Sequence, residues 1–140
     1  MNFTFHYLLM ANHLMLQKQL FNNIKDLELT LGQPKVLDYL WENNGAMQKD
    51  IAKGCHIEPA SLSTILNGME KNDLITRNID KQSKRNINIF MTEKGKKVCE
   101  RIKQEFIEIE SKALFHFSEK EIKQLTEYMI KIYNNLEERS

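Results

Sequence analysis

The segment from Pro59 to Lys71 combines residue types that can read the edges of DNA bases. Its apolar side chains recur at i, i+3, i+4 and i+7, the spacing of one buried helical face: Leu62, Ile65, Leu66 and Met69. The opposite flank is short and polar, and it consists of Ala60, Ser61, Ser63, Thr64, Asn67, Gly68 and Lys71. Such small or hydrogen-bonding side chains let a helix approach the floor of a DNA groove. The chemistry that this pattern predicts is binding rather than catalysis.

Each position on this flank suits a particular contact with a duplex. The Asn67 amide can pair with adenine through two hydrogen bonds, while Ala60 and the Thr64 methyl group suit thymine methyl groups. Lys71 suits a phosphate, and a helix beginning at Pro59 presents free N–H groups that also attract phosphate. Because the flank lacks arginine, the usual reader of guanine, we expect a binding site rich in A·T pairs. The alternative is an ordinary solvated helix face, since amphipathicity is common among surface helices.

A basic segment follows this helix at a short interval. Two strand-like runs, Leu74–Arg77 and Ile87–Met91, flank a polar stretch, which predicts a hairpin. The cations of the segment are Arg77, Lys81, Lys84 and Arg85. Taken alone, a basic loop is usually just solvated. Directly after a helix-turn-helix, it predicts a wing that contacts the minor groove or its phosphates.

The remaining elements must position the polar-flanked helix and the basic hairpin. We expect a helix from Phe5 to about Lys25, and a second that Thr30 caps, with Pro34 in its first turn. A short helix over Gln48–Gly54 precedes the polar-flanked helix. After the hairpin, Thr92 can cap another helix, and a capping box at Ser118–Glu121 opens the last one. The order predicts a mostly α fold with a small β-hairpin, a winged helix-turn-helix.

Charge is distributed unevenly along the chain. The 140 residues suit one compact domain, and the net charge is only +1. From Arg77 to Lys97, however, seven Lys or Arg face two Asp or Glu, a balance of +5. From Val98 to Ser140 the counts are seven and nine, a balance of −2. A basic segment beside an acidic tail favours a nucleic-acid partner for the hairpin region.

Other function classes find little support. Cys55 and Cys99 form no disulfide framework or zinc spacing, and we expect both to be buried hydrophobes, with redox sensing as the alternative. His6 and His13 have no neighbouring ligand that completes a metal site. The sequence has no phosphate-binding glycine loop, nucleophile elbow or zinc-hydrolase spacing. We therefore predict no enzyme activity and no cofactor.

The chain also lacks signals for a membrane or for export. No stretch approaches eighteen apolar residues, and the N-terminus lacks the basic start and cleavage site of a signal peptide. We expect a cytoplasmic protein.

An ordered set of short motifs resembles the MarR (multiple-antibiotic-resistance regulator) family. The set comprises Leu29-Thr30, Gln33–Leu37, Asp50–Lys53, Pro59–Ser63, Met69–Ile75, Lys84-Arg85 and Met91–Gly95. Each motif is weak by itself, but their order and spacing are specific. The resemblance implies a transcriptional regulator, expected to be a repressor, that small aromatic acids or phenols, or a thiol oxidant, release from DNA.

The resemblance also implies a homodimer whose terminal helices, 1–29 and 93–140, intertwine around DNA-binding lobes formed by residues 30–92. The terminal segments support this independently, because large exposed apolar patches are rare on monomers. Their apolar residues are Phe5, Leu8, Leu9, Leu16, Leu20, Phe106, Ile109, Leu114, Phe115, Phe117, Ile122, Leu125, Met129 and Ile132. A two-fold dimer would read a pseudo-palindrome with half-sites about 34 Å apart.

The sequence departs from the family pattern at several positions. Ser83 stands where an Asp commonly precedes the wing arginine pair, and Lys84 replaces the first Arg. His56 occupies a turn position that favours Gly, and Met47 stands where a Ser or Thr cap is usual.

The rival hypothesis from another class is a winged helix that docks proteins instead of DNA, which would explain the modest net charge.

Overall fold

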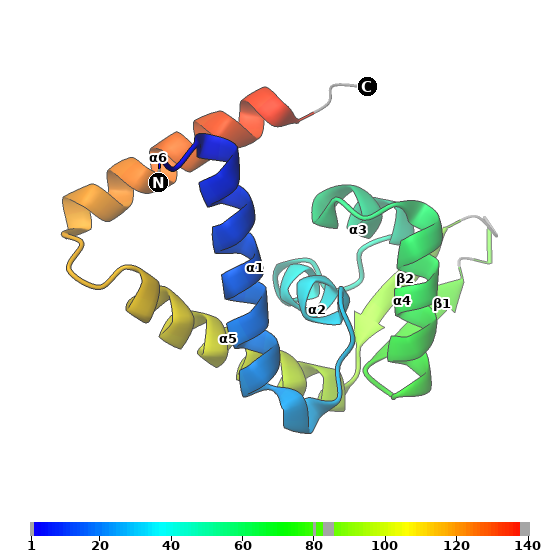
Figure 1. The fold of residues 1–140 in the computed structure, drawn as a ribbon. Coiled ribbons are helices and arrows are strands. Elements are labelled where there is room, and N and C mark those ends of the chain that lie inside the picture. Colours follow the sequence, from blue (N-terminus) through cyan, green and yellow to red (C-terminus); the bar gives the residue numbers. More distant parts are fainter. Residues whose placement is uncertain (1, 80, 83–85, 138–140) are drawn as a thin grey trace. The chain divides into compact units, whose positions relative to one another are not determined.

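A computed structural model describes residues 2–79, 81–82 and 86–137 (Figure 1). Within this part of the chain the elements are α1 (Phe5–Asn23), a 3-10 turn (Lys25–Leu27), α2 (Gln33–Glu42), α3 (Gln48–Cys55), α4 (Pro59–Lys71), β1 (Ile75–Ile79), β2 (Ile87–Met91), α5 (Glu93–Ala113) and α6 (Glu119–Leu136). The predicted order of helices and hairpin is confirmed. The chain divides into two compact units, residues 1–107 and 108–140.

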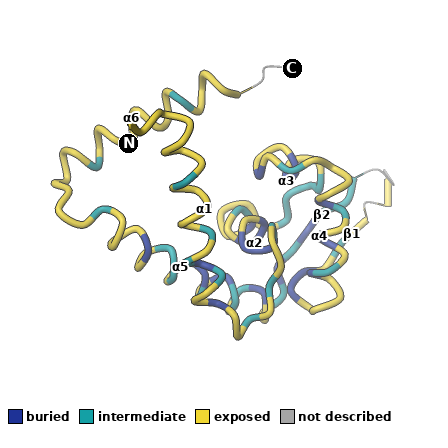
Figure 2. Tube along the Cα trace, in the orientation of Figure 1, coloured by how far each residue is buried: buried dark blue, intermediate teal, exposed yellow. Residues whose placement is uncertain are grey.

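The core of the first unit lies between α2, α3, α4, the hairpin and the start of α5, where buried residues are concentrated (Figure 2). Burying aliphatic side chains removes apolar surface from water and provides most of the stabilisation. The fully buried side chains include Val36, Leu37, Leu40, Ile51, Leu62, Leu66, Met69, Ile89, Cys99 and Ile102. All the elements that carry the predicted DNA contacts therefore share one core.

The start of α2 differs from the expectation of a Thr30 cap. The N-cap is Gly32, whose φ of 90° lies in the left-handed region that glycine adopts readily. The Thr30 N–H donates to Oε1 of Gln33 (3.1 Å), so the side-chain hydrogen bond runs from Gln33 back to the Thr30 backbone and not from the Thr30 side chain to the first turn. Pro34 lies in the first turn, as predicted. A tight turn at a glycine therefore displaced the N-cap by two residues, from Thr30 to Gly32.

The hairpin is attached to the connection between α2 and α3. β1 and β2 are antiparallel, with Arg77 opposite Ile89. The Gly45 N–H donates to the Ile89 carbonyl (2.8 Å), and the Ile89 N–H donates to the Ala46 carbonyl (2.9 Å). Met47, which lacks the cap usual at its position, instead forms a β-bridge with Asn88. These backbone bonds fix the root of the hairpin beside the helix-turn-helix.

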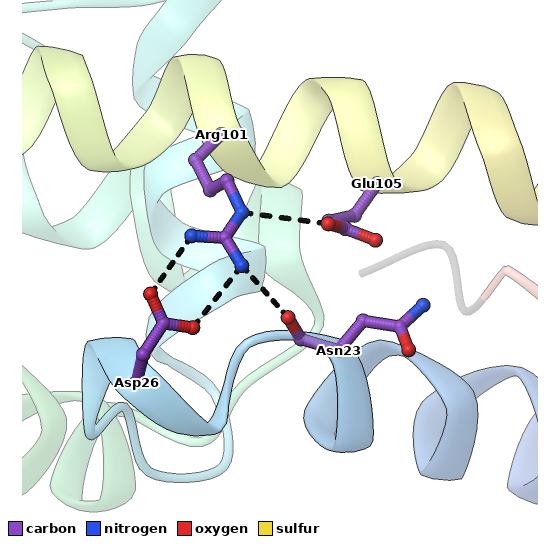
Figure 3. Close-up of polar contacts among 4 residues, drawn as sticks. All are labelled: Asn23, Asp26, Arg101 and Glu105. Atoms are coloured by element: carbon purple, nitrogen blue, oxygen red, sulfur yellow. Dashed lines mark hydrogen bonds and ion pairs between the residues drawn. The ribbon is translucent and has the colours of Figure 1, made fainter.

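Arg101 joins α5 to the segment that follows α1 (Figure 3). Its Nη1 and Nη2 donate to the two carboxylate oxygens of Asp26 (2.8 and 3.1 Å), and Nη2 also donates to the Asn23 carbonyl (2.9 Å). The Arg101 Nε donates to Oε1 of Glu105 (3.4 Å). The hydrogen bonds from Arg101 lower the pKa of Asp26. This cluster holds the 3-10 turn against α5.

The second unit contains the end of α5 and all of α6. The predicted capping box is present: the Glu121 N–H donates to Ser118 Oγ (3.1 Å), and the Ser118 N–H donates to Glu121 Oε1 (3.0 Å). In a single chain α6 leaves many apolar residues exposed, namely Leu125, Tyr128, Met129, Ile130, Tyr133 and Leu136. In the described part of the chain, no helix is both long enough and apolar enough to cross a membrane.

Candidate nucleic-acid interface

α3 and α4 form a helix-turn-helix through a left-handed turn. His56 ends α3 with φ 55° and ψ 45°, the conformation expected to be uncomfortable for a residue other than glycine. The Ile57 N–H donates to the Ala52 carbonyl (2.9 Å) and closes the turn. α4 then buries Leu62, Leu66 and Met69 and half-buries Ile65. The predicted apolar face of α4 is confirmed.

The opposite flank of α4 faces solvent. Its exposed residues are Pro59, Ala60, Ser61, Thr64, Asn67 and Lys71. Ser63 is half-buried, because it lies nearer to α3. The structure therefore presents a row of short side chains along one helix, the geometry that a groove-binding helix needs. Contact of these residues with DNA stays a prediction.

Two hydroxyl groups on this flank already have internal partners. Ser63 Oγ accepts a hydrogen bond from Nε2 of Gln48 at the start of α3 (3.0 Å). Thr64 Oγ1 donates to the Ala60 carbonyl one turn earlier (3.4 Å), which is a common bond in helices. The hydroxyl group is therefore engaged, and the methyl group remains as the apolar part of the Thr64 side chain. Ser63 thus braces the helix-turn-helix. Gln48 was missing from the predicted site, and no sequence signal distinguishes it from a surface glutamine.

Arg77 lies at the root of the hairpin, and its guanidinium faces α4. Nη1 donates to Oδ1 of Asn67 (2.8 Å) and lies 3.8 Å from Oε1 of Glu70, while Nη2 donates to the Ser63 carbonyl (3.4 Å). Among the residues that the structure describes, its buried Nε has no hydrogen-bond partner. The strand pattern could have indicated this placement, because Arg77 lies two residues after the buried Ile75 and therefore on the same face of β1.

The other predicted cations follow Arg77 in the sequence. Lys81 is exposed. Lys84 and Arg85, together with the divergent Ser83, fall outside the described residues. The wing contacts expected at these positions therefore stay predictions from the sequence.

Both cysteines are buried, as expected. The Cys55 thiol lies 3.8 Å from the Lys35 carbonyl, and the Cys99 thiol donates to the Leu37 carbonyl (3.2 Å). Burial raises the pKa of each thiol to about 11. A low-pKa exposed thiolate is what redox sensors use, and neither cysteine provides one. In the described ranges no cluster of three His, Cys, Asp or Glu side chains could hold a metal ion.

We predict that both thiols react slowly in the folded protein. Near pH 8, a pKa of about 11 leaves on the order of a thousandth of each thiol ionised, against roughly a fifth in an unfolded chain. Modification by an aromatic disulfide reagent should therefore be at least about a hundredfold slower in buffer than in denaturant. Because the folded pKa is raised, the associated stability is present below the unfolded pKa and decreases as pH rises toward about 11. A fast native reaction of either thiol would contradict this.

The turn between α3 and α4, the solvent-facing polar flank and the adjacent hairpin define a winged helix-turn-helix protein. Comparison with known proteins agrees with this class. The MarR family model matches residues 29–87. The chain is similar to an uncharacterised HTH-type transcriptional regulator, YybA, of Bacillus subtilis, at 29% identity over 113 residues, which cover 81% of this chain and 75% of YybA.

Two solved structures are similar over nearly the full length. A crystal structure of the S. aureus MepR–DNA complex is 32% identical with a TM-score of 0.85, and the match covers 97% of this chain and 100% of that one. A putative MarR family transcriptional regulator from Listeria monocytogenes, complexed with a 26mer DNA, is 29% identical with a TM-score of 0.88, covering 97% and 90%. The chain belongs to the MarR family of transcriptional regulators.

Proposed function

We propose that this protein binds duplex DNA sequence-specifically as a homodimer and represses transcription until a small molecule releases it. The observation that carries the proposal is the solvent-facing flank of α4, which combines short polar side chains with a cation at its C-terminal end, Lys71. Base edges in the major groove are accessible to such a helix. The complexes of MepR and of the Listeria regulator with DNA support the proposal.

The homodimer is supported by apolar surface at both ends of the chain. In a single chain α1 exposes Phe5, Tyr7, Leu8, Leu9, Met10, Leu14, Met15 and Leu16, and α6 exposes the residues given above. Apolar surface of this extent is unusual on a monomer and favours association. We assign dimerisation to residues 1–29 and 93–140, and DNA binding to the lobe formed by 30–92. Sedimentation at micromolar concentration tests whether the protein is a dimer.

Selection of binding sites from random duplexes tests sequence-specific binding. We expect an A·T-rich consensus with two half-sites about 34 Å apart, since the exposed flank of α4 has no arginine. A G·C-rich consensus would contradict the predicted readout. Titration with random duplex at low salt separates the protein-docking alternative, because a DNA-binding protein retains salt-sensitive non-specific affinity and a docking module does not.

Release by a small molecule is the part of the proposal that rests on the family. The recovered binding site, labelled and bound by the protein, provides the assay. Aromatic acids and phenols should lower the affinity of the dimer if they favour a conformation that cannot hold both half-sites. A reporter gene behind the same site tells repression from activation.

We predict that Arg85→Ala weakens binding to every sequence to a similar extent. If Arg85 neutralises one phosphate, its loss should reduce the slope of log affinity against log salt by about 0.9 per lost contact. Lys120→Ala, a charge removed from the exposed start of α6, should leave affinity and slope unchanged. An Arg85→Ala variant with the wild-type slope would show that the hairpin is not a DNA-contacting wing.

A further inference from the structure

We propose that Arg77 is a positioning residue: it fixes the orientation of the Asn67 amide and so determines which base Asn67 can read. The inference rests on the proposed DNA-binding function. It concerns the contact between the root of the hairpin and α4, in which Nη1 of Arg77 donates to Oδ1 of Asn67 at 2.8 Å.

The chemistry of the two side chains determines the polarity of this contact. A guanidinium carries only N–H donors, so it can bind the oxygen of an amide but not its nitrogen. Oδ1 of Asn67 therefore faces Arg77, and the Nδ2 group, with its two donors, is left for another partner. Without Arg77 the amide could rotate and present either end, because the outer torsion of Asn is broad.

Arg77 is well placed to hold this orientation. Its guanidinium contacts three groups spaced along α4, the Ser63 carbonyl, the Asn67 amide and the Glu70 carboxylate. The Arg77 side chain is 20% exposed, so little of it is left to follow a phosphate. It also extends from β1, whose backbone is paired with β2. Asn67 itself is exposed on the flank predicted to enter the groove.

This orientation changes what Asn67 is expected to read. Pairing with adenine through two bonds needs the amide oxygen for N6 and the amide nitrogen for N7. Oδ1 has a second lone pair, but this oxygen is directed at Arg77, so the group that Asn67 presents to the acceptor N7, which adenine and guanine both have, is Nδ2. The base contacted by Asn67 should therefore be a purine of either kind. The expected A·T bias would come from the other positions on the flank.

The test compares base preferences of variants in site selection. Asn67→Ala first identifies the base position that depends on Asn67, as the one at which the purine preference disappears. Arg77→Met keeps an unbranched stem in place of the Arg77 stem but removes every donor, which releases the amide. We expect wild type to accept adenine and guanine within about twofold, and Arg77→Met to favour adenine by about tenfold, the discrimination of a two-bond pair.

Two results would overturn the proposal. One is an unchanged ratio of adenine to guanine in Arg77→Met, with equal weakening on all sequences and a reduced salt slope, which is the behaviour of a phosphate contact. The other is a wild-type protein that already favours adenine about tenfold, since that requires the amide oxygen for the base. A wild-type protein without salt-sensitive binding to any duplex would instead disprove the proposed function itself.

A second variant keeps the inference testable if Arg77→Met does not fold. Asn67→Asp retains an oxygen acceptor for Arg77 but replaces the outward donor with a second acceptor. The preferred base at that position should change from a purine to cytosine, whose N4 group donates to a carboxylate. Circular dichroism should show the wild-type helix content. An Asn67→Asp variant that still selects purines would overturn the proposal.

Discussion

Replacing Gly95 with alanine is expected to destabilise the first unit by about 2 kcal/mol or more. A Cβ at this position would lie 2.1 Å from the carbonyl oxygen of Leu74, which belongs to the backbone and cannot move aside as a flexible side chain could. Overpacking of this kind costs up to about 3 kcal/mol, and the better helix propensity of alanine offsets only about 1 kcal/mol.

The backbone at this junction is held in place from several directions. The Thr92 N–H donates to the same Leu74 carbonyl (3.0 Å), and Thr92 Oγ1 donates to the Asp73 carbonyl (2.6 Å) while it accepts from the Gly95 N–H (2.9 Å). These bonds join the end of α4, the hairpin and the start of α5. The methyl group that Gly95→Ala adds could be accommodated only by breaking some of these bonds, so DNA affinity should decrease together with stability.

Gly68→Ala is the matched control. Its Cβ would lie 3.2 Å from Nε2 of Gln33, the end of a side chain, and α4 would gain helix propensity. Urea unfolding at a fixed protein concentration should place Gly68→Ala within about 1 kcal/mol of wild type. Equal unfolding midpoints for Gly95→Ala and wild type would contradict the close approach at Leu74.

Among substitutions in α4, Leu66→Ala should have a large effect, a loss of about 2–5 kcal/mol of unfolding free energy. Leu66 is fully buried in the core shared by α2, α3 and α4, so truncation removes apolar contacts and leaves a cavity. Because a protein of this size has only about 5–15 kcal/mol of net stability, much of it would be lost. α4 would then no longer be held at a defined angle to the hairpin.

Leu31→Ala provides the comparison for Leu66. Leu31 is 63% exposed in the loop before α2, and its truncation should change stability by no more than about 0.5 kcal/mol. Urea titrations of both variants at one protein concentration measure the difference. Similar losses in the two variants would mean that the buried face of α4 contributes little to the core.

The order and the ends of most elements follow from the sequence alone, because the signals involved are local. The Ser118 capping box, the Thr92 cap and the start of α4 at Pro59 depend on hydrogen bonds or torsions within a few residues. The apolar period of α4 likewise predicted which of its faces is buried. Residues whose role follows from helix period alone, such as Asn67, were therefore found on the exposed flank.

Which polar groups already have protein partners depends on how the elements pack together. Arg77 looked from sequence like a free cation of the wing, yet its guanidinium lies against Ser63, Asn67 and Glu70. Gln48 and Ser63 are fifteen residues apart, and their bond depends on the angle between α3 and α4. Such contacts arise only when separate elements pack together, and no local pattern encodes that packing. The DNA-contacting residues were predicted from their positions in the sequence. Whether their side chains are available to DNA depends on the contacts that they make in the folded lobe.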